Sequence, residues 1–310
     1  MKILFVGSAN KNNGISVITK NQGESLRRRG HEVDYYAING KGIWGYFTNL
    51  INLREKIYSK QYNIIHAHYL YSGLLVGIAT RKIFILSLMG SDVYTRKIFH
   101  RFIIYSLRYF CKIKFIVKSE EMKKLTKLKN AFVLPNGVNT EVFVEHTRNQ
   151  SLDLMNFNKN KKHVIFLGDP KNFIKNYSLA NKVFQRLNNK NIDTHLITKF
   201  DHERLPFLFS AADLLLFTSH FEGSPNIIKE AMACNCPIVS TDVGDVKRNL
   251  INTRNCSVVK PSPEIMADEV IKILAVGGRS TGRVEIFKKQ LDSNSIAIKL
   301  EILYKSVCLC

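Results

Sequence analysis

Two glutamates eight residues apart, Glu222 and Glu230, have the spacing that points most directly to chemistry in this 310-residue chain. The apolar run at residues 212–218 predicts a buried strand, so Glu222 should lie in the loop at the carboxyl end of that strand. Ligands of α/β sheets bind at such ends. Glu230 should lie about one and a half turns inside the helix that follows, roughly 8 Å further along its axis. One carboxylate could therefore reach a sugar while the other reaches the ribose of a nucleoside.

The segment between these glutamates predicts a helix start that binds an anion. Ser224 suits the N-cap, and Pro225 suits the first helical position, where its missing N–H costs nothing. The N–H groups of Asn226 and Ile227 would then lack helical partners and face outward at the positive end of the helix dipole. Such a site accepts a phosphate. The alternative is an amphipathic helix with two solvated glutamates, which is the usual meaning of an isolated pair with this spacing.

A lysine follows the strand predicted to begin at residue 163. Lys175 lies after a loop and just before an expected helix, where a cation can pair with a diphosphate and stabilise it as a leaving group. Lys171 is a second basic residue of the same loop. The alternative is that both are surface lysines at a helix start. The six cysteines show no metal-ligand spacing, so reduced thiols and no metal site are expected.

Two histidines lie on another predicted strand, at residues 63–69. His66 and His68 point to one face of that strand, so their spacing does not choose between them. Either one, taken alone, would more often be a hydrogen-bonded core residue.

The elements that must position these residues alternate between strand and helix, which predicts an α/β fold of two Rossmann-like domains. The first domain is expected at residues 1–155, and the second at residues 160–282. Between them the chain turns polar and loses its periodicity around residues 145–162, as a linker would. Gly7 and Gly14 are too far apart for a dinucleotide fingerprint, so no NAD site is inferred.

The string EGSPNIIKEAMACNCPIVSTDVGDV, residues 222–246, closely resembles the donor-site motif of retaining family 4 glycosyltransferases, the glycosyl transferases group 1. The resemblance covers most of the chain. It implies the GT-B fold, in which two Rossmann-like domains face each other across a cleft and a C-terminal helix, here about residues 285–310, packs back on the first domain. It also implies a nucleotide-sugar of UDP or GDP type as substrate, with no cofactor.

The same resemblance implies a role for each candidate residue. Glu230 would hold the ribose, while Glu222 and His68 would act at the transferred sugar. Gly90 and Asp92 would lie at the cleft. The diphosphate would be bound by the glycine loop, the lysines and the helix start: Gly14, Lys171, Lys175, Gly223, Ser224, Pro225, Asn226 and Ile227. The chain departs from the family pattern at four positions, which hold Asn13, Met89, Asn139 and, where an arginine is usual, Asp169.

The net charge of +21 is concentrated in the N-terminal half. Residues 1–150 carry 24 Lys and Arg against 9 Asp and Glu, and residues 96–129 carry eleven against two, interleaved with aromatic side chains. This stretch suits an anionic membrane surface or a phosphate-bearing acceptor. A solvated basic helix is the plainer alternative. Nucleic acid is not expected, because no nucleic-acid-binding motif accompanies the charge.

The expected protein is therefore a retaining glycosyltransferase that transfers a sugar to a glycan or lipid-linked acceptor, in bacterial surface polysaccharide synthesis. No apolar run approaches the roughly 18 residues of a spanning helix, and the N-terminus lacks a signal-peptide pattern. A cytoplasmic enzyme is expected, peripheral on the inner face of the cell membrane. The alternatives are a nucleotide-sugar epimerase or hydrolase of the same fold, or a non-catalytic basic scaffold.

Overall fold

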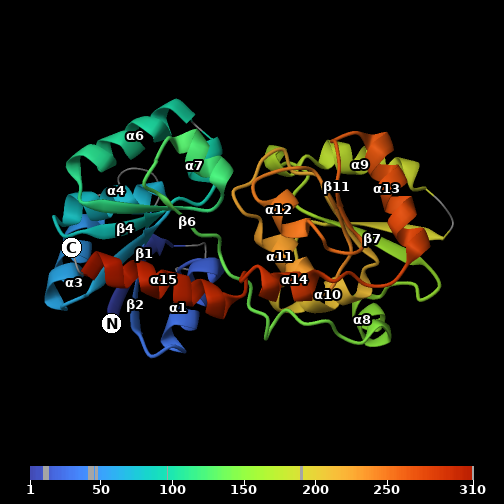
Figure 1. Cartoon of the computed structure of the whole chain (residues 1–310), viewed down its shortest axis with the longest axis horizontal. Coiled ribbons are helices and arrows are strands. Elements are labelled where there is room, and N and C mark those ends of the chain that lie inside the picture. The colour runs from blue at the N-terminus through green and yellow to red at the C-terminus, as the bar shows by residue number, and fades with distance from the viewer. Residues whose placement is uncertain (10–13, 41–44, 46–47, 96, 189–190, 309–310) are drawn as a thin grey trace. The chain divides into compact units, whose positions relative to one another are not determined.

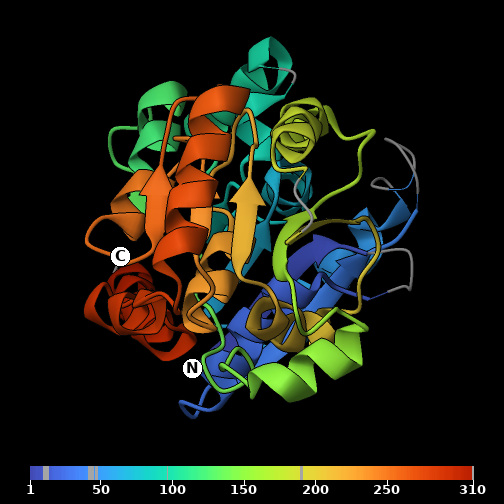
Figure 2. The same cartoon turned by 90° about the vertical axis from the view of Figure 1, so that its right-hand side faces the viewer.

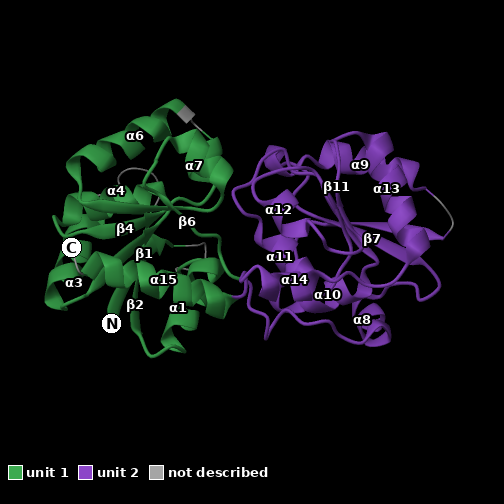
Figure 3. Ribbon diagram, viewed as in Figure 1, with its two compact units in different colours: residues 1–137, 293–310 green, residues 138–292 purple. Residues whose placement is uncertain are grey.

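The computed structural model describes the whole chain except residues 10–13, 41–44, 46–47, 96, 189–190 and 309–310. The chain divides into two compact units, which Figure 3 colours separately. Unit 1 comprises residues 1–137 and 293–310, and unit 2 comprises residues 138–292. Asn13 and Arg96, which belong to the glycine loop and the basic stretch considered above, lie outside the described residues.

The sheet of unit 1 is parallel and has the strand order β2-β1-β3-β4-β5-β6. Its described strands are β1 (Lys2–Ser8), β2 (Glu32–Ile38), β3 (Ile64–His68), β4 (Phe84–Ser87), β5 (Ile113–Val117) and β6 (Phe132–Val133). Apolar side chains fill consecutive positions of β1, so both faces of that strand are buried. This is the pattern of a parallel sheet that helices cover on both sides.

Helices α1 (Val17–Arg27) and α15 (Ser293–Cys308) cover the face of this sheet that carries Phe5 and Ile85. The opposite face carries Leu86, which packs against Gly73 of α4 (Leu70–Ala79). Helices α3 (Leu50–Ser59) and α6 (Lys97–Phe110) pack beside α4 (Figure 1). The short helices α5 (Ser91–Tyr94) and α7 (Glu120–Thr126) follow β4 and β5.

The sheet of unit 2 has the order β11-β10-β9-β7-β8 and is also parallel, so the strand arrowheads visible in Figure 2 point the same way. Its described strands are β7 (Lys162–Leu167), β8 (Ile192–Ile197), β9 (Leu214–Phe217), β10 (Ile238–Ser240) and β11 (Cys256–Val258). Together the two sheets confirm the strand-like runs predicted from the sequence, although most strands are shorter than the runs that contain them.

Two groups of helices cover the faces of the unit 2 sheet. Helices α9 (Tyr177–Arg186) and α13 (Pro263–Val276) pack against the face that carries Val164 and Leu216. Helices α10 (Leu205–Ala211), α11 (Asn226–Ala233) and α14 (Gly282–Lys288) pack against the face that carries Ile165 and Leu215. The remaining elements are α8 (Arg148–Met155), α12 (Val246–Leu250) and two 3-10 turns, η1 (Phe173–Lys175) and η2 (His202–Arg204).

The boundary between the units lies earlier than the sequence analysis predicted. The polar segment at residues 145–162 belongs to unit 2, because Phe143 is buried in its core and Arg148 on α8 pairs with Asp213 at 2.8 Å. At the other end, α15 belongs to unit 1 but begins only at Ser293. The preceding α14 stays with unit 2, where Gly282 packs against the backbone of α11.

Each sheet has a switch point at which the strand order reverses. In unit 1 it lies between β1 and β3, and in unit 2 between β7 and β9. The loops that leave two such strands run to opposite faces of the sheet, so a crevice opens between them at the carboxyl edge. Within the described part of the chain, no helix is long and apolar enough to cross a bilayer.

Candidate active site

The two loops at the switch point of unit 2 carry an ion pair. Lys175 lies in η1, after β7, and Glu222 lies in the loop after β9. The Lys175 Nζ donates to the Glu222 Oε1 at 2.7 Å, and both side chains are partly buried, with 27% and 19% exposed. The structure therefore brings together two residues that lie 47 positions apart and that the sequence analysis treated as separate candidates.

Close packing between the two loops fixes Lys175. The Thr218 hydroxyl donates to the Lys175 carbonyl at 2.9 Å, and the N–H of His220 donates to the Ile174 carbonyl at 2.9 Å. At the end of β7, a Cβ on Gly168 would lie 3.0 Å from the Lys175 Cγ, so glycine makes room for the lysine stem. The ammonium is thus held at the carboxyl edge of the sheet, with N–H donors left over after it binds Glu222.

The loop that carries Glu222 rests on a glycine from the next strand-to-helix connection. Gly244 has a φ of +58°, and a Cβ there would lie 2.6 Å from the carbonyl oxygen of Glu222 and 2.5 Å from that of Gly223. Any side chain at position 244 would displace this loop. The segment STDVGDV, residues 240–246 at the end of the motif, therefore supports the loop that carries Glu222 at its beginning.

Ser224 does not cap α11, contrary to the prediction from the sequence. The N-cap is Pro225, and Asn226 is the first helical residue. The Ser224 hydroxyl instead accepts a hydrogen bond from the Lys229 Nζ at 2.8 Å, because that buried ammonium needs an acceptor. Asn226 and Ile227 still begin the helix, so their N–H groups have no carbonyl within it to bond.

Lys229 is a site residue that the sequence analysis missed. Its side chain is fully buried, and burial lowers its pKa, while the nearby charge of Asp245 acts in the opposite direction. Burial likewise raises the pKa of Asp245, and Lys229 opposes that shift. The residue spacing in α11 could have identified Lys229 as buried, because it lies three residues before Met232 and four before Ala233, both of which are buried.

Glu230 also has a partner that the sequence did not suggest. His202, in η2 after β8, lies with its Nε2 3.2 Å from the Glu230 Oε1. This hydrogen bond is the largest cause of the raised pKa of His202. The Glu230 side chain is 12% exposed and has about four lone-pair sites, so it can still accept from other donors. The loop residue His202 follows no periodic pattern that could have identified it.

Lys171 is the one predicted cation that the structure leaves outside this cluster. It lies in the loop between β7 and η1, where its backbone N–H donates to the Asp169 Oδ1 at 2.9 Å, and the residue is exposed. Asp169, which stands where the family has an arginine, therefore shapes the turn. The cation fixed by contacts in this loop is Lys175.

The switch point of unit 1 holds the two histidines of β3, and their surroundings differ. His66 is bonded at both ring nitrogens, to the Tyr304 hydroxyl at 2.7 Å and the Ser87 hydroxyl at 2.9 Å. His68 stacks on His66 with ring centroids 4.3 Å apart, and its Nε2 has no hydrogen-bond partner among the described residues. His66 is thus a core residue, and His68 is the one with a ring nitrogen to offer.

Burial holds His68 in its neutral form. It lowers the pKa of His68 to about 3, and the charge of Lys118 adds to the effect. Near neutral pH the ring can donate or accept a hydrogen bond, but it has no proton to give as an acid. The side chain is 1% exposed, so protein atoms cover its ring nitrogens in this structure.

The other unit 1 candidates mainly shape loops. Gly90 has a φ of +88° and precedes α5, and Gly14 is an exposed residue in a bend before α1. Asp92 is 4% exposed, and its Oδ2 accepts the N–H of Met89 at 2.7 Å. Burial raises the pKa of this carboxyl. Asp92 therefore braces the loop after β4 from inside unit 1, a role that the sequence did not predict.

Two families together match most of this chain, each over less than half of its length. The family described as glycosyl transferases group 1 matches residues 139–276, and the family described as glycosyl transferase 4-like matches residues 3–120. An uncharacterised glycosyltransferase of Methanocaldococcus jannaschii is 26% identical over 252 residues, which are 76% of this chain and 72% of that protein.

Solved structures show the same architecture at low identity. The Anabaena protein HepE in complex with UDP and glucose has a TM-score of 0.77 at 15% identity, covering 99% of this chain and 100% of that one. Sucrose-phosphate synthase of Thermosynechococcus elongatus has a TM-score of 0.74 at 16% identity, covering 99% and 98%. With the matches to both families, this likeness confirms the resemblance seen in the sequence: the chain belongs to the group 1, family 4 type of glycosyltransferases and has the GT-B fold.

Proposed function

We propose that this protein is a retaining glycosyltransferase that moves a sugar from a nucleotide-diphospho-sugar to a glycan or lipid-linked acceptor, in the synthesis of bacterial surface polysaccharide. The observation that carries the proposal is the Lys175–Glu222 pair at the switch point of unit 2, directly before the start of α11. The likeness to HepE, which was solved with UDP-glucose, supports a donor of UDP or GDP type.

The proposed donor site divides its ligand among three groups. Glu230, oriented by His202, accepts the ribose hydroxyls. Lys175 and the N–H groups at the start of α11 bind the diphosphate, because they combine a charge with oriented donors. Glu222 binds the transferred sugar and holds the lysine in place. Lys171, exposed in the adjoining loop, adds charge, and Gly14 of unit 1 belongs to the proposed diphosphate site by resemblance alone.

In the proposed reaction, the bond between the anomeric carbon and the diphosphate oxygen breaks as the acceptor oxygen bonds to the same face of that carbon. The acceptor proton passes to the departing phosphate oxygen, and the products are a nucleoside diphosphate and a glycoside. Lys175 stabilises the charge that develops on the diphosphate. Neutral His68 offers a hydrogen bond to the sugar without placing a positive charge beside an oxocarbenium-like centre.

This proposal needs no metal and no cofactor, because Lys175 and the helix start supply the charge that a metal would. We therefore expect transfer to survive EDTA. Among the described residues, no group of three or more His, Cys, Asp and Glu side chains could hold a metal ion. Loss of transfer on EDTA treatment and its recovery with Mg²⁺ or Mn²⁺ would instead indicate a metal-dependent mechanism.

A panel of UDP- and GDP-sugars tests the proposal, with thermal unfolding as the first measurement. A bound donor raises the unfolding temperature by mass action, and the stabilising sugar identifies the donor. Product analysis with and without acceptor then separates the functions. Transfer requires the acceptor, whereas hydrolysis or epimerisation of the donor proceeds without it. A protein that binds neither nucleotide would be a non-catalytic scaffold.

A further inference from the structure

Helix α6 in unit 1 has two apolar faces, only one of which is used for packing. The inner face is buried at the spacing of a helix that packs on its neighbours: His100, Ile103, Ile104 and Leu107. A second stripe runs along the outer face with spacings of four, three and four residues. Its members are 89%, 70%, 37% and 85% exposed: Ile98, Phe102, Tyr105 and Tyr109. A surface helix normally carries polar residues there.

The side chains beside this outer stripe are basic. Arg101 and Arg108 are exposed on α6, and Lys112 is exposed in the connection to β5. Helix α6 contains no Asp or Glu. The combination of exposed aromatic rings with arginine and lysine is typical of helices that lie in the interface of an anionic membrane, where the rings enter the headgroup region and the cations meet phosphate.

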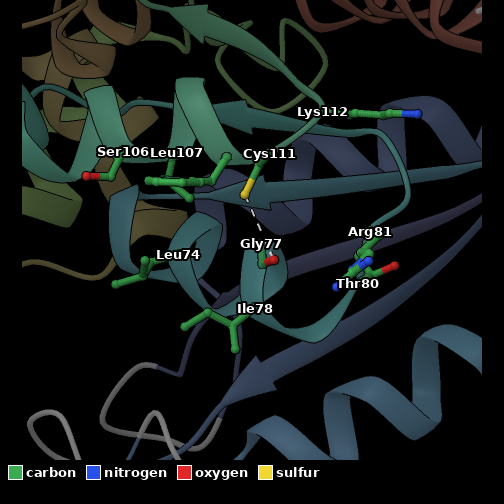
Figure 4. Close-up of a pocket in the computed structure, with 10 residues that line it drawn as sticks. Leu74, Gly77, Ile78, Thr80, Arg81, Ser106, Leu107, Cys111 and Lys112 are labelled. Atoms are coloured by element: carbon green, nitrogen blue, oxygen red, sulfur yellow. Dashed lines mark hydrogen bonds between the residues drawn. The ribbon is translucent and has the colours of Figure 1, made fainter.

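A pocket of about 530 Å³ adjoins the same helix (Figure 4). Leu74 and Ile78 of α4, with Leu107 and Phe110 of α6, give it apolar walls. Arg81 and Lys112 both line the pocket on the side away from Leu74, and the Lys112 side chain points outward (Figure 4). Its dimensions and lining suit a ligand with an anionic head and an alkyl chain, rather than a sugar, which would need more hydrogen-bonding groups.

The pocket lies at the opposite edge of the unit 1 sheet from the switch point. Arg81 precedes β4 and Lys112 precedes β5, so both are at the amino ends of parallel strands. His68 lies at the carboxyl end of β3. A ligand in this pocket is therefore remote from the residues proposed to act on the sugar, and the pocket cannot be a part of the same site within unit 1.

We infer that the outer face of α6 and the adjoining pocket form a docking site for an anionic phospholipid bilayer. The exposed stripe enters the interface, while one lipid places an alkyl chain against the pocket walls and its phosphate at Arg81 and Lys112. The sequence analysis assigned membrane binding to the whole basic stretch, residues 96–129. The docking site uses only its first half, since α7 in the second half begins with Glu120 and Glu121. The inference does not depend on the proposed donor chemistry.

Sedimentation with vesicles tests the charge requirement. We expect binding to vesicles that contain phosphatidylglycerol, little binding to phosphatidylcholine alone, and release at high salt. Arg81→Gln with Lys112→Gln should weaken binding about 30-fold, since each basic residue contributes about 1 kcal/mol near an anionic surface. Lys182→Gln with Lys272→Gln, on α9 and α13 of unit 2, is the matched control and should bind as the wild type does.

The apolar stripe has its own test and control. Phe102→Ser with Tyr109→Ser should lower binding at least about tenfold, because both rings would otherwise leave water on docking. Both side chains are exposed, so the fold should be retained. Ile271→Ser with Val276→Ser removes two exposed apolar side chains from α13 of unit 2 and should have no effect. UDP affinity should be unchanged in all four variants, which separates failure of docking from failure of the donor site.

Cys111 reports directly on the pocket that it lines. Its reaction with a maleimide should slow several-fold when phosphatidylglycerol vesicles are added, while that of the exposed Cys308 on α15 should not. Mass mapping follows the two thiols separately. If the protein binds vesicles while Cys111 reactivity is unchanged and the Arg81/Lys112 variant binds as the wild type does, the pocket is not a lipid-binding site. Equal binding to neutral and anionic vesicles, or an unaffected Phe102/Tyr109 variant, would overturn the docking site as a whole.

Discussion

At its switch point unit 2 presents charged side chains in pairs, whereas unit 1 presents histidines that burial keeps neutral. Lys175 and Glu222 are partly exposed and bonded to each other, and Glu230 is bonded to His202, whose pKa is raised. In unit 1, the pKa of His68 falls to about 3 and its partner His66 is enclosed by hydroxyl groups. The same topology therefore carries two electrostatic environments.

The difference corresponds to the two ends of the proposed donor. A diphosphate needs cations and N–H donors that are already oriented, because its charge grows as it leaves. The sugar carbon becomes more positive in the same step, and a neutral His68 adds no positive charge of its own there. Unit 2 supplies the charged groups and unit 1 supplies a neutral histidine, so each demand corresponds to a different unit. The following variants test this division of roles.

The largest effect is expected for Lys175→Ala in the charged site. It removes the cation that stabilises the leaving diphosphate, so kcat should fall by roughly 10² or more, with a smaller change in KM. Steady-state kinetics with the donor identified by thermal unfolding measure both values. Lys171→Ala in the same loop is the matched control, and it should cost much less because no hydrogen bond or ion pair to another described residue holds its exposed side chain.

A double variant sharpens this prediction, because Lys175 and Glu222 contact each other. If they act as a unit, the loss for Lys175→Ala with Glu222→Gln should be clearly smaller than the two single losses combined. Additive losses would mean that the pair at the switch point of unit 2 has no joint role. Unchanged kcat in Lys175→Ala would remove the lysine from the proposed mechanism altogether.

Glu230→Ala should weaken nucleotide binding rather than turnover. A carboxylate that accepts ribose hydroxyls forms hydrogen bonds worth about 1.5 to 3 kcal/mol each, so the Kd for UDP or GDP should rise by about 10- to 100-fold. Calorimetric titration measures it. His202→Gln keeps a donor at the partner position, and it should lose less affinity. Wild-type affinity in Glu230→Ala would show that the ribose is bound elsewhere.

The contrast between the units also shows what the sequence could reveal. The apolar runs predicted the strands, and the motif placed Glu222 and Glu230 around a helix start, because both depend on neighbours in the chain. The Lys175–Glu222 contact depends on which strands are adjacent in the sheet. The hydrophobic periodicity of a single segment does not predict strand order, so the sequence did not predict this contact. The N-cap prediction failed at Ser224 because a buried lysine from the next turn bonds its hydroxyl.

Lys229→Met tests whether this buried charge supports the charged site of unit 2. The change leaves the Ser224 hydroxyl without its donor and removes a cation near the buried Asp245. The free energy of unfolding should fall by about 1 to 3 kcal/mol. Adding Asp245→Asn should restore part of the loss, and Lys247→Met, at an exposed position on α12, should change little. Urea denaturation measures all three, and full stability in Lys229→Met would assign the lysine no structural role.

The smallest effect is expected for the neutral site of unit 1, where His68→Gln should reduce the sensitivity of the fold to acid. His68 has a pKa of about 3 in the folded protein, against about 6.5 in an unfolded chain. Between these values the unfolded chain binds a proton that the folded protein does not, so the free energy of unfolding falls as the pH decreases. From pH 7 to 5.5 this contribution lowers the free energy of unfolding by roughly 1.3 kcal/mol, and the His68→Gln variant lacks it.

Urea denaturation at both pH values measures the difference, with His220→Gln, exposed in unit 2, as the control. A His68→Gln protein that loses as much stability as the wild type would mean that His68 titrates normally, and the electrostatic contrast between the two switch points would then be wrong.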